Sequence, residues 1–441
     1  MSDYIYMLES RLEPDQNRAV EALRASAGEA NVNVFLTGGA MRDMLGGFRI
    51  RDLDFAVEGN ALKVAKAFCD RTNAATVSTD ENQRSTELLL ASGATVQISM
   101  SRREKYARPG AKPQVTPATI QDDLRGRDFT CNAIALSLNQ ASRGLLLDPM
   151  NGLADIGRRE LRSVSAYGFY DDPSRLLRLE RFRVRLGFTI EDRTQMQVAN
   201  AREAGVEKLI PARVLGEELK RISAEDSPAE ILRALEGAEL LAPISPALAG
   251  PKLNLPGLAK FEKICRLLPD DARHRAARLG PFFYVLTEQM TPKEEQSLIH
   301  GAGLQKAEAD LWLKLGALAK KLESALRSPR IRKPSQVYQI ASEAAPDEIL
   351  FLLYRSSLKP VQERLRNYFQ KYLPAVQEIA AEELARVEGK PGTPRYQKAR
   401  AEFIARRLDH PPRKPAPPPP APPPLPEPQP LRRGRIGGTA R

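Results

Sequence analysis

The spacing of hydrophobic residues changes near residue 150 and predicts two regions of different structure. Before this point, short apolar runs and alternating apolar and polar positions are typical of strands. The predicted strands span residues 32–36, 52–57, 75–78, 87–91, 95–100 and 145–149. After it, apolar residues recur at helical spacing to about residue 408, and prolines punctuate the helices. The pattern therefore predicts an α+β chain with its strands in the N-terminal third.

A pair of glycines follows the first buried strand. The apolar run of residues 34–36 ends at Gly38 and Gly39, and residues 40–45 are predicted to form a short helix. Glycine lets backbone N–H groups approach a phosphate closely, and a helix N-terminus adds a favourable potential for an anion. This turn is a candidate phosphate-binding element.

The next strand carries two aspartates, Asp52 and Asp54. Side chains at positions i and i+2 of a strand share a face, so both carboxylates point the same way, while Leu53 and Phe55 point into a core. Two neighbouring carboxylates repel each other, and a divalent cation relieves that repulsion. The pattern predicts a metal–nucleotide site, although a surface turn before an exposed acidic edge strand would have the same local sequence.

These two motifs together, GGAMRDMLGG and RDLDF, resemble the head of the nucleotidyltransferase superfamily that includes DNA polymerase β. More narrowly, they resemble the branch of CCA-adding tRNA nucleotidyltransferases and bacterial poly(A) polymerases. The resemblance implies a polymerase β-like head with a mixed sheet, followed by an all-helical neck, body and tail. It also implies two Mg²⁺ ions on Asp52 and Asp54, with Gly38, Gly39 and Arg42 at the β- and γ-phosphates.

A second motif, RDFTCNA, begins at Arg127. The apolar stretch 130–138 is expected to be buried, so the polar groups of Arg127, Asp128 and Asn132 enter an interior and require partners. An aspartate N-cap with an arginine partner would explain them. The resemblance instead implies that Arg127 contacts triphosphate, while Asp128 and Asn132 hold the ribose and the local loop.

A third motif, DDPSR, precedes an arginine-rich helix predicted within residues 171–188. Asp172 at the helix start and Arg175 one turn later can converge on one planar edge. In the family that this resembles, such a pair reads the Watson–Crick edge of the incoming base, and Arg178 belongs to the same nucleotide site. A solvent-exposed N-cap aspartate with an i,i+3 ion pair is the alternative.

Two features depart from the family pattern. Relatives often carry an acidic residue on the strand at 95–100, where this chain has Gln97, so a third carboxylate ligand is not assigned. Asp171 and Asp172 stand where Glu-Asp is more frequent. Residues 101–122 are polar, basic and proline-containing, and are expected to form a mobile loop until something binds.

Composition narrows the function classes. The chain has 441 residues, 42% of them hydrophobic, and a formal net charge of +12, which favours a polyanionic partner. No apolar run approaches a membrane span, no signal peptide is recognised, and three scattered cysteines favour a reducing cytoplasm. With only three histidines, a His-Asp phosphohydrolase domain is excluded. From Pro411 the sequence is rich in proline and arginine and predicts polyproline II and coil.

The predicted organisation has six parts. They are an N-terminal helix (1–30), a nucleotidyltransferase head (31–152), a nucleotide-selecting neck (153–225), a helical body (226–330), a helical tail (331–408) and a disordered Pro/Arg-rich tail (409–441). The predicted activity is Mg-dependent nucleotidyl transfer from CTP and ATP to an RNA 3′ end, most simply CCA addition to tRNA. Poly(A) synthesis, partial CC or A addition, and a non-catalytic RNA-binding protein are the alternatives. No membrane and no required protein partner is expected.

Overall fold

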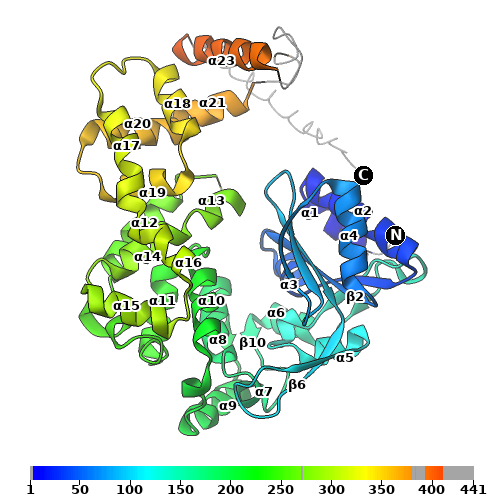
Figure 1. Ribbon diagram of the computed structural model, residues 1–441. Coiled ribbons are helices and arrows are strands. Elements are labelled where there is room, and N and C mark those ends of the chain that lie inside the picture. The colour runs from blue at the N-terminus through cyan, green and yellow to red at the C-terminus, as the bar shows by residue number, and fades with distance from the viewer. Residues whose placement is uncertain (1–2, 270–271, 380–382, 384–392, 411–441) are drawn as a thin grey trace, which may run out of the picture. The chain divides into compact units, whose positions relative to one another are not determined.

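The computed structural model describes residues 3–269, 272–379, 383 and 393–410 (Figure 1). The chain divides into two compact units, residues 1–374 and 375–441. In the second unit, α23 (Pro394–Asp409) is amphipathic and buries Ile404 and Leu408. The predicted Pro/Arg-rich tail lies outside the described residues, apart from the last residue of α23 and His410.

Two helices, rather than the single helix predicted, form the N-terminal segment: α1 (Asp3–Arg11) and α2 (Pro14–Ala30). Pro14 occupies the first turn of α2, where its missing N–H is not needed. The Gln16 side chain accepts a hydrogen bond from the Glu13 N–H at 3.0 Å and stabilises this start. The apolar face of both helices, including Leu8 and Leu23, joins the main core.

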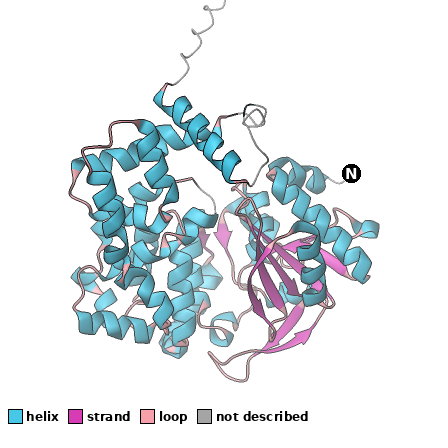
Figure 2. Ribbon diagram, turned by 45° about the horizontal axis from the view of Figure 1, so that its top comes forward, coloured by secondary structure: helices cyan, strands magenta, loops and turns pink. Residues whose placement is uncertain are grey.

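A seven-stranded mixed sheet organises the N-terminal region, as predicted (Figure 2). Its order is β3-β4-β5-β2-β1-β8-β9. The strands are β1 (Asn33–Thr37), β2 (Asp52–Glu58), β3 (Ala75–Asp80), β4 (Ser85–Leu89), β5 (Thr95–Met100), β8 (Ala135–Ser137) and β9 (Leu146–Leu147). β2 and β5 pair in parallel, while the other neighbours are antiparallel, including the predicted β4–β5 hairpin.

The two faces of β2 have different coverings. Leu53, Phe55 and Val57 point into the main core, which also contains residues of α2, α3 (Gly38–Gly46) and α4 (Ala61–Thr72). Ala56 lies on the opposite face with Phe35, in a small cluster closed by α5 (Ile120–Gly126). Alternation along the strand places Asp52 and Asp54 on the same face as Ala56. This arrangement is the one predicted from the sequence.

A second hairpin replaces the mobile loop expected over residues 101–122, so that prediction was wrong. Its strands are β6 (Arg102–Lys105) and β7 (Gln114–Pro117), which pair antiparallel from Arg102–Pro117 to Lys105–Gln114. α5 then begins at Ile120, after the Thr119 N-cap. The sequence signal was weak because both strands are short and polar, so neither shows apolar alternation.

Short helices and one small strand pair follow the head. They are α6 (Gly152–Arg158), β10 (Glu160–Leu161), α7 (Gly168–Asp171), α8 (Arg175–Leu186), β11 (Thr189–Ile190), α9 (Asp192–Glu203), η3 (Val206–Leu209) and α10 (Ala212–Ser223). The predicted helix at 171–188 is confirmed as α8, but it begins only after Pro173. The parallel β10–β11 pair was missed because two-residue strands leave no periodic signal.

The rest of the first unit is helical, as predicted. Its elements are α11 (Pro228–Gly237), η4 (Pro246–Leu248), η5 (Gly250–Lys252), α12 (Leu255–Cys265), α13 (Ala272–Ala276), α14 (Leu279–Thr287), α15 (Pro292–Gly301), α16 (Lys306–Leu313), α17 (Leu315–Arg327), α18 (Pro334–Glu343), α19 (Pro346–Arg355), α20 (Lys359–Asn367), η6 (Tyr368–Tyr372) and α21 (Leu373–Gln377). None of the helices in the described residues is long and apolar enough to cross a membrane.

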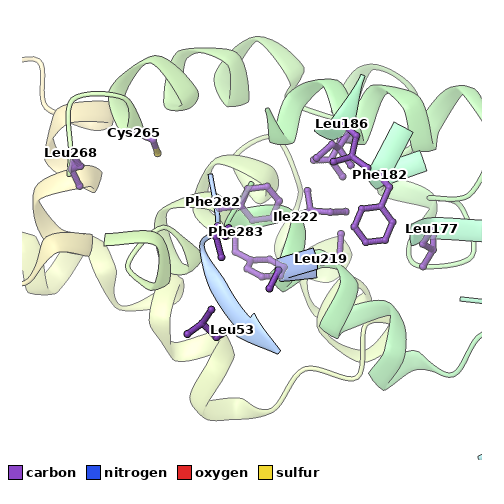
Figure 3. Close-up of a cluster of buried hydrophobic side chains, with 14 of the residues drawn as sticks. Leu53, Leu177, Phe182, Leu186, Leu219, Ile222, Cys265, Leu268, Phe282 and Phe283 are labelled. Carbon is purple, nitrogen blue, oxygen red and sulfur yellow. The ribbon is translucent and has the colours of Figure 1, made fainter. Parts of the chain in front are cut away.

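The core continues from α8 into these helices. Figure 3 shows Phe182 of α8, Leu219 of α10 and Phe282 of α14 within one buried cluster. Trp312, the only tryptophan of the chain, stacks on Phe283 with ring centroids 4.8 Å apart and donates its indole N–H to Glu295. Trp312 therefore serves packing.

Candidate active site

The glycine turn brings the start of α3 against a carboxylate. Gly38 has a φ of +62°, which favours glycine, and a Cβ at this position would lie 3.3 Å from Asp54 Oδ2. A Cβ at Gly39 would lie 3.2 Å from the same oxygen. The Gly39 N–H donates to Asp54 Oδ2 at 3.2 Å. Close approach therefore favours glycine at both positions, and the turn and Asp54 form one site.

Asp52 and Asp54 have different surroundings. Asp52 is exposed, accepts a hydrogen bond from Thr95 Oγ1 on β5, and lies 3.7 Å from the Arg275 guanidinium of α13. Asp54 is partly buried behind the glycine turn. Burial and the negative charge of Asp52 raise the pKa of Asp54 to about 6, while Arg127 and the Gly39 N–H act in the opposite direction.

This donor set fits a divalent cation. A cation beside Asp52 and Asp54 would offset the burial and the repulsion that raise the pKa of Asp54. Among the described residues, no group of three or more His, Cys, Asp or Glu side chains is placed to bind a metal ion. Mg²⁺ needs no such cage, because it is commonly held by one or two carboxylates together with substrate phosphates and water. Gln97, which pairs with Asp54 in the β2–β5 register, supplies no third carboxylate.

A buried chain of hydrogen bonds lies next to this turn. Arg42 donates to Asp43 Oδ1 at 2.9 and 2.7 Å and to Asn132 Oδ1 at 2.8 Å. The Asn132 amide donates to Asp128 Oδ1 at 3.0 Å, and Arg178 Nε donates to Asp128 Oδ2 at 2.9 Å. We call these five side chains the Arg42–Arg178 network. It joins α3, the 3₁₀ turn at residues 130–132 and α8.

Arg42 therefore has partners that differ from the triphosphate expected for it. Its side chain is 2% exposed, and its guanidinium lies 5.0 Å from the centre of the Phe182 ring. Asp43 was not singled out in the sequence, yet it also accepts from Arg185 at 3.1 Å. The structure gives Arg42 a positioning role behind the glycine turn, and phosphate contact by Arg42 stays a prediction.

Asp128 shows the opposite electrostatics to Asp54. Burial alone would raise its pKa, but Arg178, the Asn132 amide and Arg175 lower it well below the usual range. The carboxylate is thus ionised and fully bonded on both oxygens, also accepting from the Phe129 N–H at 2.7 Å. It holds α8 against the head, and the predicted ribose contact is untested.

Arg127, like Arg42, lies next to the glycine turn: a Cβ at Gly39 would lie 3.5 Å from Arg42 Nη2. A Cβ at Gly38 would lie 3.8 Å from Arg127 Nη1, while Arg127 Nε donates to Asp123 Oδ1 at 2.7 Å. Burial lowers the pKa of Arg127, but Asp123, Asp54 and Asp128 act in the opposite direction and the pKa is raised overall. One side of the guanidinium is anchored and the other lies beside the turn, which is a suitable arrangement for phosphate.

Asp172 and Arg175 lie close together, as predicted, with Arg175 Nε 3.9 Å from Asp172 Oδ2. Asp172 Oδ1 accepts from the Ser174 N–H and hydroxyl at 3.1 and 2.6 Å, so Asp172 precedes α8 and Ser174 is its N-cap residue. Arg175 is buried and donates to the carbonyls of Gly126 and Arg127 at 2.9 and 3.2 Å. Arg175 thereby ties the selecting pair to the segment that carries Arg127.

Comparisons with known proteins show the family of this chain. Residues 34–162 match the family described as Poly A polymerase head domain. A Multifunctional CCA protein from Nitrosococcus oceani is 30% identical over 341 residues, which cover 74% of this chain and 79% of that protein. The chain belongs to the family of CCA-adding tRNA nucleotidyltransferases and bacterial poly(A) polymerases.

Two further comparisons concern the length and the fold. An A-adding tRNA nucleotidyltransferase from Aquifex aeolicus is 28% identical over 349 residues, which cover 77% of this chain but only 40% of that protein. The chain thus matches less than half the length of this relative. A solved CCA-adding enzyme in an apo form has the same fold, with a TM-score of 0.53 and 24% identity over 92% of this chain and 95% of that one.

Proposed function

We propose that this chain catalyses Mg-dependent transfer of a nucleotidyl group from CTP and ATP to the 3′ end of tRNA, restoring the CCA end. The observation that carries the proposal is Asp54 set against the glycine turn, with Asp52 on the same face of β2. Family membership and the names of the relatives support it. We also propose a cytoplasmic location, in line with the three free cysteines.

Asp52 and Asp54 would hold the divalent cations of this reaction. When bound, such cations lower the pKa of the attacking 3′-hydroxyl and neutralise charge on the leaving pyrophosphate. The Thr95 hydroxyl orients the Asp52 carboxylate, and the Gly39 N–H orients that of Asp54. The two aspartates act as ligands, so the reaction needs no separate general base.

The chain's own donors would bind the triphosphate. The N-terminus of α3 favours an anion at the glycine turn, where the Gly39 N–H already donates to Asp54. Arg127 stands beside this turn and adds a full positive charge. The attacking hydroxyl and the α-phosphate would meet next to Asp52 and Asp54, on the open side of β2.

Asp172 and Arg175 would select the base. A carboxylate accepts a hydrogen bond from the exocyclic amino group of cytosine or adenine, and a guanidinium donates to a ring nitrogen or carbonyl. Asp172 Oδ1 is used by Ser174, which leaves Oδ2 available for a base. The bonds from Arg175 to residues 126 and 127 would keep this pair in a fixed relation to Arg127, and hence to the phosphates.

A-addition alone is the second candidate, because the Aquifex relative is named an A-adding enzyme. The same carboxylates and the same base-selecting pair would serve that reaction. The distinction between CCA addition and A addition therefore rests on which RNA ends are extended and with which nucleotide.

An RNA panel tests the proposal. Purified protein is incubated with Mg²⁺, labelled CTP or ATP, and tRNAs that end before CCA, after C or after CC, together with an unstructured RNA. CCA addition predicts that CTP extends the tRNAs that end before CCA or after C, and that ATP extends the tRNA that ends after CC. A addition predicts extension only of the tRNA that ends after CC, and only with ATP. Extension of unstructured RNA by ATP alone would indicate a poly(A) polymerase. Incorporation on none of the RNAs would contradict the proposal and favour a binding protein.

A further inference from the structure

Asp123, one helical turn before Arg127, is shared between two donors. Its Oδ1 accepts a hydrogen bond from Arg127 Nε at 2.7 Å, and its Oδ2 accepts from the Arg102 N–H at 3.1 Å. Asp123 is 6% exposed and lies in α5, which packs beside β6 (Figure 1). A carboxylate accepts on both oxygens, whereas an amide accepts on one only, so the ionised side chain serves both donors where an amide could not.

The pair with Asp123 leaves the other side of the Arg127 guanidinium beside the glycine turn. Arg127 Nη1 and Asp54 Oδ2 both lie within 4 Å of the position that a Cβ of Gly38 would take. Burial and Asp52 raise the pKa of Asp54, and the charge of Arg127 acts in the opposite direction. Asp54 is therefore a competing partner for Arg127, and the hydrogen bond to Asp123 anchors the guanidinium on the side away from it.

The β6–β7 hairpin that supplies the Arg102 N–H is held at its far end as well. Gly110, between β6 and β7, has a φ of +70°. A Cβ built at Gly110 would collide with the carbonyl oxygen of Leu209, so the hairpin backbone packs directly against the end of η3. The second donor to Asp123 thus comes from an ordered hairpin.

The backbone at Arg127 is fixed separately from its side chain. Arg175 donates to the carbonyls of Gly126 and Arg127 at 2.9 and 3.2 Å. These bonds set where the Arg127 side chain begins, but not where its guanidinium points. The bond to Asp123 sets that direction.

We propose that Asp123 is a positioning residue for the triphosphate, which holds the Arg127 guanidinium toward the β- and γ-phosphates and away from Asp54. The inference rests on the proposed function and adds to it a residue that acts through Arg127. The Arg102 N–H, by binding the second oxygen of Asp123, keeps the carboxylate in the required orientation. A guanidinium that is fixed in advance loses less conformational freedom when it binds phosphate, so the affinity for a triphosphate rises.

The neighbouring residue, Asp122, offers a matched control. Its carboxylate pairs with Arg103 at 3.0 Å, but this pair lies at the surface, where the side chains of Asp122 and Arg103 are 32% and 56% exposed. Asp122→Asn therefore removes the same charge as Asp123→Asn, one position away, from a carboxylate that pairs with Arg103 instead of Arg127.

The test measures nucleotide binding rather than turnover. Calorimetric titration with ATP and with AMP, in Mg²⁺ and without RNA, gives the ratio of the two Kd values. Both nucleotides have the same base, ribose and α-phosphate, so the ratio isolates the contribution of the β- and γ-phosphates. We expect Asp123→Asn to reduce the preference for ATP about tenfold, because an amide that accepts from the Arg102 N–H turns its NH₂ group toward Arg127. Asp122→Asn should keep the ratio of the natural chain.

Arg127→Gln shows whether Asp123 acts through Arg127. In this background, Asp123→Asn should reduce the preference for ATP no further, since no guanidinium is left to position. A role in stability alone would lower the melting temperature and weaken ATP and AMP equally. If Asp123→Asn does not fold, Asp123→Glu replaces it: this variant keeps the charge, moves both oxygens by one methylene, and should also reduce the preference.

The outcomes separate the two proposals. If the natural chain prefers ATP to AMP and the Asp123 variant keeps that preference, the inference is overturned and the proposed function stands. A further loss of preference in the double variant, or an equal loss in Asp122→Asn, would likewise overturn the inference. If the natural chain does not bind ATP more tightly than AMP, both proposals are overturned.

Discussion

Asp54 and Asp128 are both carboxylates withdrawn from solvent in the head, yet their surroundings shift their pKa values in opposite directions. Asp54 has burial and a second aspartate against it, which raise its pKa to about 6. Asp128 has two arginines and an amide around it, which lower its pKa well below the usual range. A carboxylate whose negative charge is not balanced by nearby donors is suited to bind a cation. A carboxylate paired with arginines stabilises the fold instead.

The same contrast extends to the two sets of residues around them. One set lies at the glycine turn and β2 and consists of Asp52, Asp54 and Arg127. The charged groups of this set can still bind a ligand. The Arg42–Arg178 network is closed, because the described contacts satisfy each of its side chains. One set would change its partners during a reaction, and the other would keep the first set in place.

The largest expected effect comes from Asp54→Asn. We expect nucleotidyl transfer to fall about 1,000-fold, because a ligand of the reacting centre is lost. Stability should change in the opposite direction. In metal-free buffer at pH 8, the free energy of unfolding should rise by about 1 kcal/mol, since a repulsive charge is removed. Single-turnover kinetics and calorimetry check the two effects. Retained activity would remove Asp54 from the metal site.

Asp128→Ala should destabilise the fold by about 3 kcal/mol, because Arg178 and Asn132 lose their shared partner inside the protein. Denaturant unfolding measures the change. Asp122→Ala is the matched control, since Asp122 forms its ion pair with Arg103 at the surface and its loss should cost much less. Equal losses in the two variants would contradict the structural role of the network.

Comparison of Gly38→Ala with Gly47→Ala distinguishes the effect of a Cβ that crowds Asp54 from the effect of backbone strain. Both glycines have positive φ, +62° and +78°, so each substitution costs about 1 kcal/mol in strain. A Cβ at Gly47 meets nothing within 4 Å, whereas one at Gly38 crowds Asp54. We therefore expect Gly38→Ala alone to weaken nucleotide transfer. A similar loss of activity in Gly47→Ala would show that strain is the cause.

The smallest expected effect is in acid stability. Because the folded-state pKa of Asp128 is lowered from its ordinary value of 3.8, its ionised form stabilises the fold above that pH. This contribution is lost as the pH falls from about 4 through the folded-state pKa. Asp128→Asn should therefore show a shallower loss of stability below pH 4 in denaturant titrations. An unchanged slope would show that Asp128 does not contribute.

Local rules predicted the open set of residues well. Alternation along β2 was enough to place Asp52 and Asp54 on one face, and the glycine turn was evident from the end of an apolar run. The closed network could not be predicted in the same way, because Arg42 meets Asn132 across 90 residues of sequence. Phosphate contact by Arg42 rests on the motif and stays a prediction.

Two other differences have separate causes. The break between α1 and α2 falls at Pro14. Proline is a helix-start signal, and the prediction of a single helix over residues 1–30 did not use it. The β6–β7 hairpin has polar strands and gains its order from Asp123 and Leu209, which lie outside the hairpin. Contacts between distant segments therefore decided both the closed network and the hairpin.

The most direct measurement of the central claim is Mn²⁺ binding followed by electron paramagnetic resonance, with Mn²⁺ as a probe for Mg²⁺ and CTP or ATP present. The natural chain should bind the ion, Asp54→Asn and Asp52→Asn should each lose most of that binding, and Asp122→Asn should keep it. Binding that is equal in all four proteins would show that the cation is held elsewhere and would contradict the account.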